Sequence, residues 1–216
     1  MAVVDQHRVI SAGVDGTLLV WDLGGERILH ELKGPAGWIN AIAVAGGCRA
    51  VFSSDNGLLR VWDFEAGSLQ TLRGHSDWVR AVAVVDDDRA ISAFDDRTLR
   101  IWSLGSLERL EKEGFYRIFQ GNDWVRSMAV DGHRIIAATA ESILRVWGLE
   151  SGQILQTLRG HKGEVRAVAL VKDHHAVSAS DDRTLRLWDL ESGKTLAVMM
   201  LGVCRETLQR CPDVVK

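Results

Sequence analysis

The sequence predicts an all-β protein of five repeated units arranged about a central axis, and three observations lead to this fold class. Tryptophan recurs about every 40 residues, each period contains four short apolar stretches, and residues that favour tight turns separate these stretches. A period of this length indicates units that are stacked or radially arranged. No segment has a sustained 3.6-residue apolar pattern, so we expect four short strands in each unit.

Five of the eight Trp residues define the period. They are Trp21, Trp62, Trp102, Trp147 and Trp188, with successive spacings of 41, 40, 45 and 41 residues. Each closes a short alternating segment, such as TLRLWDL around Trp188. Because alternate residues of a strand face opposite sides, we expect Leu185 and Leu187 on one face and Arg186 and Trp188 on the other.

The other three strands of each unit have their own patterns. Residues 41–44, 81–84, 127–130 and 167–170 are apolar without alternation and rich in small side chains, which predicts an inner strand buried on both faces. A second strand such as 176–180 follows, and then a turn of the DDRT, DNGL or VDGT type. After the Trp strand we expect a more polar outer strand such as 153–158, as radial packing requires.

Several short motifs resemble those of the WD-repeat family. They are Gly74-His75, Gly160-His161, the Ser-Ala-x-Asp-Asp turns and the ending Trp188-Asp189, and the resemblance covers about residues 1–200 in five registers. It implies a β-propeller of five four-stranded antiparallel blades. The assembly is expected to be either a closed five-blade ring or an open arc or fragment of a larger propeller.

The repeat register also predicts the organisation of the chain. We place blades at about 1–32, 33–73, 74–119, 120–159 and 160–200 and leave the C-terminal tail 201–216 unassigned. Extra residues around 107–119 are expected to form a protruding loop. When Trp21 is aligned with Trp188, the first residues of the chain fall inside the innermost strand of the first blade. Rings of WD repeats more often have seven or eight blades. We therefore favour a fragment or an arc completed by another chain, including self-association that completes the ring.

The resemblance further implies a buried hydrogen-bonded set in each blade that links His, Ser or Thr, Asp and Trp. Two repeats have the complete set: His75, Ser92, Asp96 and Trp102 in the third, and His161, Ser178, Asp182 and Trp188 in the fifth. The first has Ser11, Asp15 and Trp21. The second repeat departs from the set, with Pro35, Phe52 and Asn56 at these positions. The fourth also departs from it, with Asn122, Ala137 and Glu141. We expect less rigid blades in these two repeats. Because the set recurs, we interpret it as structural and not as a catalytic triad.

A second Trp series points to a partner-binding surface. Trp38, Trp78 and Trp124 precede the innermost strands, where the fifth repeat has Glu164, and two residues later stand Asn40, Arg80, Arg126 and Arg166. These side chains are expected to ring one mouth of the channel. Exposed Trp and Arg are typical of binding hot spots, and Arg favours carboxylates or phosphates. In the alternative, each Trp covers the core of its own blade and the Arg side chains are only solvated.

Composition narrows the function classes. The net charge of −3 with dispersed basic residues gives no basic stripe for nucleic acid. No apolar run approaches the roughly 18 residues of a membrane span, and no signal pattern begins the chain, so we expect a cytoplasmic protein without membrane partners. Cys48, Cys204 and Cys211 are too dispersed for a disulfide framework or a metal motif. The stretches His174-His175 and Asp86–Asp88 are interpreted as solvated turns, not metal sites.

These patterns favour a non-catalytic scaffold or sensor module, of the kind found in signalling, that binds protein partners on a propeller face. The alternative is a small-ligand or carbohydrate-binding propeller that uses the Trp-lined mouth for stacking. An enzyme would need a single, non-repeating cluster of acid, base or metal ligands at the mouth, and the sequence has none. We expect no cofactor.

Overall fold

A computed structural model describes residues 1–33, 37–54, 57–73, 78–104, 115–120, 124–171 and 174–201. These residues form five four-stranded sheets in which each strand pairs antiparallel with the next along the chain. The predicted all-β fold with four-stranded antiparallel units is therefore confirmed. In the described part of the chain, no helix is long and apolar enough to cross a membrane.

The sheets follow one another in sequence. The first contains β1 (Ala2–Val3), β2 (Arg8–Ala12), β3 (Leu18–Asp22) and β4 (Arg27–Leu32), and the second β5 (Ile39–Ala45), β6 (Arg49–Ser54), β7 (Leu59–Asp63) and β8 (Ser68–Leu72). The third contains β9 (Val79–Asp86), β10 (Arg89–Phe94), β11 (Thr98–Ser103) and β12 (Phe115–Gln120), and the fourth β13 (Val125–Val130), β14 (Arg134–Thr139), β15 (Ile143–Gly148) and β16 (Ile154–Arg159). The fifth contains β17 (Val165–Val171), β18 (His175–Ser180), β19 (Thr184–Asp189) and β20 (Thr195–Met200).

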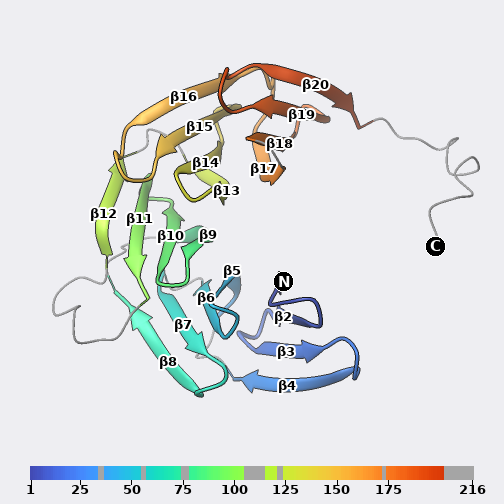
Figure 1. The fold of residues 1–216 in the computed structure, drawn as a ribbon, viewed down its shortest axis with the longest axis vertical. Coiled ribbons are helices and arrows are strands. Elements are labelled where there is room, and N and C mark those ends of the chain that lie inside the picture. The colour runs from blue at the N-terminus through green and yellow to red at the C-terminus, as the bar shows by residue number, and fades with distance from the viewer. Residues whose placement is uncertain are drawn as a thin grey trace, which may run out of the picture.

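The five sheets lie around a central axis as an open arc (Figure 1). The first strand of each sheet is innermost and the fourth is outermost, and β5, β9, β13 and β17 contact one another in that order. The first and fifth sheets face each other across the open side. Of the two arrangements that the sequence left open, the structure shows the arc.

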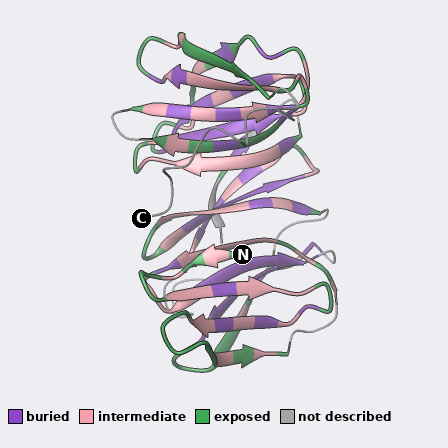
Figure 2. Ribbon diagram, turned by 90° about the vertical axis from the view of Figure 1, so that its right-hand side faces the viewer, coloured by how far each residue is buried: buried purple, intermediate pink, exposed green. Residues whose placement is uncertain are grey.

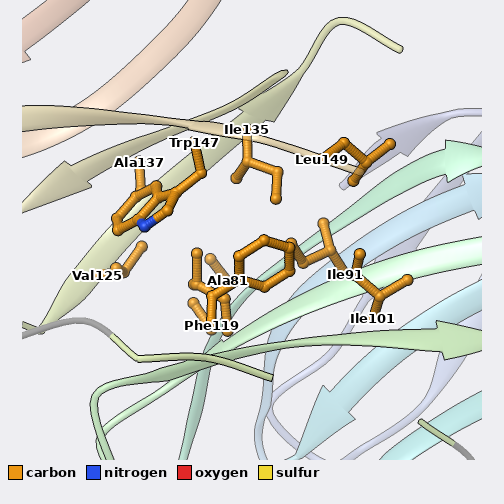
Figure 3. Close-up of a cluster of buried hydrophobic side chains, with 11 residues drawn as sticks. Ala81, Ile91, Ile101, Phe119, Val125, Ile135, Ala137, Trp147 and Leu149 are labelled. Carbon is orange, nitrogen blue, oxygen red and sulfur yellow. The ribbon is translucent and has the colours of Figure 1, made fainter. Parts of the chain in front are cut away.

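The hydrophobic core lies between neighbouring sheets, and each sheet contributes two different faces. Between the third and fourth sheets, Ile91, Ile101 and Phe119 pack against Ile135 and Trp147 (Figure 3). We call the side of a sheet that carries the repeat Trp its Trp face and the opposite side its Leu face. At this interface the Leu face of the third sheet meets the Trp face of the fourth.

The same pairing holds the other sheets together. The Leu face of the first sheet packs against Trp62 of the second, the Leu face of the second against Trp102, and the Leu face of the fourth against Trp188. Each of these indoles is at most 3% exposed. Burial of such large apolar side chains is the main favourable contribution to folding, at roughly 25 cal/mol per Å². The period of the Trp strands is therefore the period of the sheet interfaces.

The burial expected for the inner strands was wrong. Residues of β5, β9 and β13 are mostly half-buried, and in β17 Arg166, Ala167 and Ala169 are exposed. The second strands β6, β10 and β14 are buried over almost their whole length, and exposed residues gather at the turns (Figure 2). The inner strands border the axial space, and within the described residues no sheet follows that of β17, so small apolar side chains remain partly accessible there.

The third unit differs from its prediction at one element. Phe115–Gln120 forms the outer strand β12, paired with β11, and Phe119 is buried against the fourth sheet. This part of the predicted 107–119 loop is therefore a strand, while residues 105–114 lie outside the described residues. The predicted tail from residue 202 onward and His75, Pro35, Asn56 and Asn122 also lie outside them.

The turn between the second and third strands requires a left-handed residue in every sheet. Gly16 and Gly57 occupy this position with φ of 81° and 73°. In the other sheets the same position holds Arg97, Ser142 and Arg183, with φ of 63°, 66° and 63°. A side chain makes this conformation costly, whereas glycine adopts it freely. Three of the five turns are therefore strained at one residue.

Candidate functional site

Three exposed indoles stand at the start of three consecutive inner strands. Trp38, Trp78 and Trp124 are 64%, 48% and 46% exposed, although each directly precedes an inner strand. The next residues, Val79 and Val125, are at most 4% exposed, so strand alternation turns the preceding Trp outward. About half of each indole is thus accessible to a partner. The chain entering each inner strand positions these side chains.

The residues two positions after the indoles meet around one hollow. Asn40, Arg80 and Arg126 line a cavity of about 300 Å³ together with the inner strands. Asn40 is exposed, and the hollow opens toward solvent. We call Trp38, Trp78, Trp124 and these three residues, with Glu164 and Arg166, the mouth. The structure therefore brings Asn40, Arg80 and Arg126 together around one hollow, and their role in partner binding stays a prediction.

The arginines of the mouth are paired with acidic residues of the chain itself. Arg80 binds Asp95 through Nε–Oδ1 at 2.9 Å and Nη2–Oδ2 at 2.6 Å. Arg166 binds Asp181 in the same way, at 3.0 and 2.7 Å. The side-chain hydrogen bonds that Arg166 donates to Asp181 raise the pKa of Arg166 and lower the pKa of Asp181. Such two-point pairs fix the guanidinium plane as well as its charge.

In the fourth sheet, the arginine of the inner strand pairs with an acidic residue of another sheet. Ala140 occupies the position of Asp95 and Asp181. Its backbone N–H donates to the carbonyl oxygen of Trp124, as those of Asp95 and Asp181 donate to the carbonyl oxygens of Trp78 and Glu164. Arg126 instead binds Glu164 of the fifth sheet, and Glu164 Oε2 lies 2.9 Å from Arg166 Nη2. The Glu that replaces Trp in the fifth unit therefore links two sheets.

Two of the three paired arginines, Arg80 and Arg126, also lie over an indole. The guanidinium carbon of Arg80 is 5.0 Å from the ring centroid of Trp78, and that of Arg126 is 5.8 Å from the centroid of Trp124. These are cation–π distances. The mouth therefore presents aromatic rings and three arginines whose charges are matched by Asp95, Glu164 and Asp181. Sequence reasoning left Asp95 and Asp181 unassigned, although the doubled Asp of the SAFDD and SASDD turns was the available signal.

Beside the mouth residues in sequence, the fifth sheet contains a connected hydrogen-bond set. Trp188 Nε1 donates to Ser178 Oγ at 2.7 Å, and His161 Nε2 lies 2.7 Å from the same oxygen. His161 Nδ1 lies 2.9 Å from Asp182 Oδ2 and must carry the proton, because a carboxylate only accepts. With a neutral imidazole, the Ser178 hydroxyl therefore donates to Nε2. Each hydrogen bond of the set therefore has one donor and one acceptor, and the N–H of the buried Trp188 indole has an acceptor.

Comparison with known proteins identifies the repeat. Residues 26–63, 67–103 and 152–189 match the family described as WD domain, G-beta repeat, and together they cover just over half of the chain. The chain belongs to the WD-repeat family. WD repeats generally mediate protein–protein interactions.

One curated relative shares a shorter segment with this WD-repeat chain. Ribosome biogenesis protein YTM1 of Eremothecium gossypii is 39% identical over 57 residues, which is 26% of this chain. The match spans 13% of the length of that relative. The similarity therefore covers little more than one WD repeat.

The other WD repeats keep parts of the hydrogen-bond set. Trp102 Nε1 donates to Ser92 Oγ at 2.6 Å, and Asp96 Oδ1 accepts from the Thr98 hydroxyl at 2.6 Å. Trp21 Nε1 donates to Ser11 Oγ at 2.8 Å in the first repeat, where the pair is only partly buried. In the second and fourth repeats, buried Phe52 and Ala137 replace the serine. The lower rigidity expected of those two blades stays a prediction.

The remaining polar clusters of the WD repeats make local contacts. Asp86 Oδ2 binds Arg89 Nε at 2.6 Å, and His174 Nδ1 lies 2.8 Å from Arg134 Nη2 of the fourth sheet. Within the described ranges, no group of three or more His, Cys, Asp or Glu side chains is placed to hold a metal ion.

Proposed function

We propose that this WD-repeat chain is a non-catalytic scaffold that binds a polypeptide partner at the mouth, with Trp38, Trp78 and Trp124 as the main contacts. The observation that carries the proposal is the exposure of the three indoles, between 46% and 64%, at the same end of consecutive inner strands. Trp is the residue most enriched among side chains that dominate interface energies. Arg80 and Arg126 support two of the rings and so limit the conformational entropy lost on binding.

The ion pairs of the mouth support one kind of partner chemistry over another. A partner carboxylate or phosphate at Arg80 would compete with a two-point pair to Asp95, and at Arg166 with one to Asp181. We therefore expect the bound segment to contribute apolar or aromatic side chains, and not the acidic groups that the sequence first suggested. Binding of this kind depends weakly on salt, because it does not rely on the charges that salt screens.

Partner capture with variant baits tests the proposal. The full chain and the variants Trp78→Ala and Trp124→Ala are used as bait in lysate of the source cell, and bound proteins are compared by mass spectrometry. Leu155→Ala is the control, because Leu155 is 52% exposed on an outer strand away from the mouth. We expect both Trp variants to keep the melting temperature of the parent and to lose a protein that Leu155→Ala retains. Loss of folding in the Trp variants would favour a covering role for these side chains.

A second candidate is a small-ligand or carbohydrate site in the same hollow. The observation in its favour is the 300 Å³ cavity lined by Asn40, Arg80 and Arg126. Sugars stack on exposed indoles and hydrogen-bond to amide and guanidinium groups, so a ligand in the hollow would change Trp fluorescence. A rise in melting temperature with a panel of sugars, lost in Asn40→Ala, would support this candidate over a polypeptide partner.

A further inference from the structure

The two ends of the arc carry opposite halves of the interface that joins the sheets. By strand register, the outward Leu face of the fifth sheet contains Val177, Ala179, Leu185, Leu187 and Met199. The outward Trp face of the first sheet contains Val9, Ser11 and Trp21, with Leu23 beside them. Inside the arc these two types of face pack against each other at every junction.

The Leu face of the fifth sheet is uncovered where its counterparts are buried. Met199 pairs with Leu185, and the residues at the same register in the second, third and fourth sheets are Leu72, Phe119 and Leu158. Those three are 1% to 3% exposed, whereas Met199 is 64% exposed. Each of the three packs against the Trp face of the next sheet.

The Trp face of the first sheet is uncovered in the same way. Leu23 is 55% exposed, while its counterparts Phe64, Leu104, Leu149 and Leu190 are 1% to 4% exposed. Trp21 is partly accessible, unlike the repeat Trp of the other sheets. Beside it lies a mainly apolar hollow of about 340 Å³, lined by Val9, Trp21 and Leu23.

We propose that the fifth sheet of one copy of this chain docks on the first sheet of a second copy. Met199 then enters the hollow beside Trp21, as Leu158 packs against Trp188 and Leu190 at the junction of the fourth and fifth sheets. The occupant is a second copy because this chain carries both halves of an interface that it already forms between its own sheets. The contact is heterologous, so it continues from copy to copy as a ring or a spiral.

An arginine that makes a polar contact at two junctions inside the arc is replaced at the fifth-sheet end. Arg49 Nη1 donates to Leu104 O of the next sheet at 2.9 Å, and Arg134 Nη1 donates to Leu190 O at 3.4 Å. The fifth sheet has the shorter His175 at the equivalent position. Docking between copies therefore depends on apolar burial, and we expect association that rises with protein concentration and is little changed by moderate salt.

The mass in solution of two end variants tests this contact. Leu23→Glu places a charge on the first-sheet end and Met199→Glu on the fifth-sheet end, and both residues are more than half exposed, so the fold tolerates them. Leu155→Glu is the control, with a charge at an exposed site on neither end. Sedimentation velocity is run over a wide concentration range, with circular dichroism to verify folding.

We expect the parent and Leu155→Glu to gain mass with concentration, and each end variant to remain at 23.8 kDa with association at least tenfold weaker. An equimolar mixture of Leu23→Glu and Met199→Glu is decisive, because it contains one intact fifth-sheet end and one intact first-sheet end. It forms a dimer and nothing larger. A parent that stays monomeric, or a mixture that does not dimerise, overturns the proposal. The two exposed faces would then be candidates for binding a different protein that has blade-type sheets of its own.

Discussion

Arg80 and Asp95 lie fifteen residues apart in the chain, yet their side chains form a two-point ion pair at the mouth, with Nη2–Oδ2 at 2.6 Å. Arg166 and Asp181 repeat the pair at the same separation. The inner strand carries the Arg, and the Asp directly follows the second strand, which pairs antiparallel with the inner strand, so one hairpin sets the geometry. Acidic residues of the same chain therefore balance the positive charges of these mouth arginines before any partner binds.

Removing one acidic partner should make the mouth attractive to anions. In Asp95→Asn the Arg80 guanidinium loses the carboxylate of Asp95, and we expect an acidic or phosphorylated peptide to bind more tightly than to the parent, with an affinity that falls as salt is raised. Because the pair is partly exposed, the free energy of unfolding should change by less than about 1 kcal/mol. Peptide titrations at low and high salt measure the effect. Asp189→Asn, at the other end of its strand, changes the net charge equally and should not bind the peptide.

The buried serine of the fifth sheet should contribute more to stability than its counterpart in the first. Ser178→Ala leaves the Trp188 N–H without its acceptor in a buried site, and we expect a loss of about 1 to 3 kcal/mol in the free energy of unfolding. Ser11→Ala removes the same bond where water reaches Trp21, so its effect should be smaller. Chemical denaturation of both variants measures the difference. Equal losses would show that burial of the indole does not control the cost.

Asp182 should make stability depend on pH in acid. Burial raises the pKa of its carboxyl, but hydrogen bonds from the Thr184 hydroxyl, the Lys162 N–H and His161 outweigh burial and hold the pKa well below its ordinary value of 3.8. The stabilisation is therefore fully present above about pH 4 and is lost as the pH falls toward the folded-state value. Urea unfolding at a series of pH values should show a smaller acid-induced loss for Asp182→Asn than for the parent. Asp15→Asn, at the equivalent turn of the first repeat, should show a smaller difference.

The strained turns should accept glycine. Arg183 has φ of 63° at an exposed position where the first two repeats have Gly16 and Gly57. Arg183→Gly removes a left-handed conformation that costs a side chain roughly 1 to 2 kcal/mol, offset in part by the greater entropy of glycine in the unfolded chain. We expect stability equal to or up to about 1 kcal/mol above that of the parent. The reverse change, Gly16→Arg, should lower the melting temperature, and a rise would contradict the assignment of strain.

The sequence was sufficient for the elements that depend on period and alternation. The spacing of Trp62, Trp102 and Trp188 predicted the sheets, and the alternation around Trp188 placed Leu187 on the opposite face, where the structure has it. Composition could not predict the burial of the inner strands, because small apolar residues suit both a packed strand and one beside an axial space. The charged residues before Phe119 concealed the outer strand β12.

The mouth was predicted in its residues but not in its pairing. Exposure of Trp78 follows from its place before a buried Val79, which alternation can predict. The pairing of Arg126 with Glu164 could not be predicted from one unit alone, because it joins two sheets and depends on Ala140 having no carboxylate. Comparison of the aligned units shows the substitution: where the Asp is absent, the next unit has Glu in place of Trp.

At every junction between the sheets, the Leu face of one sheet packs on the Trp face of the next sheet along the chain. Inserting or deleting one whole unit therefore leaves two compatible surfaces in contact. Unequal recombination between such units can lengthen or shorten the gene in steps of about forty codons, and each product retains junctions that already pack.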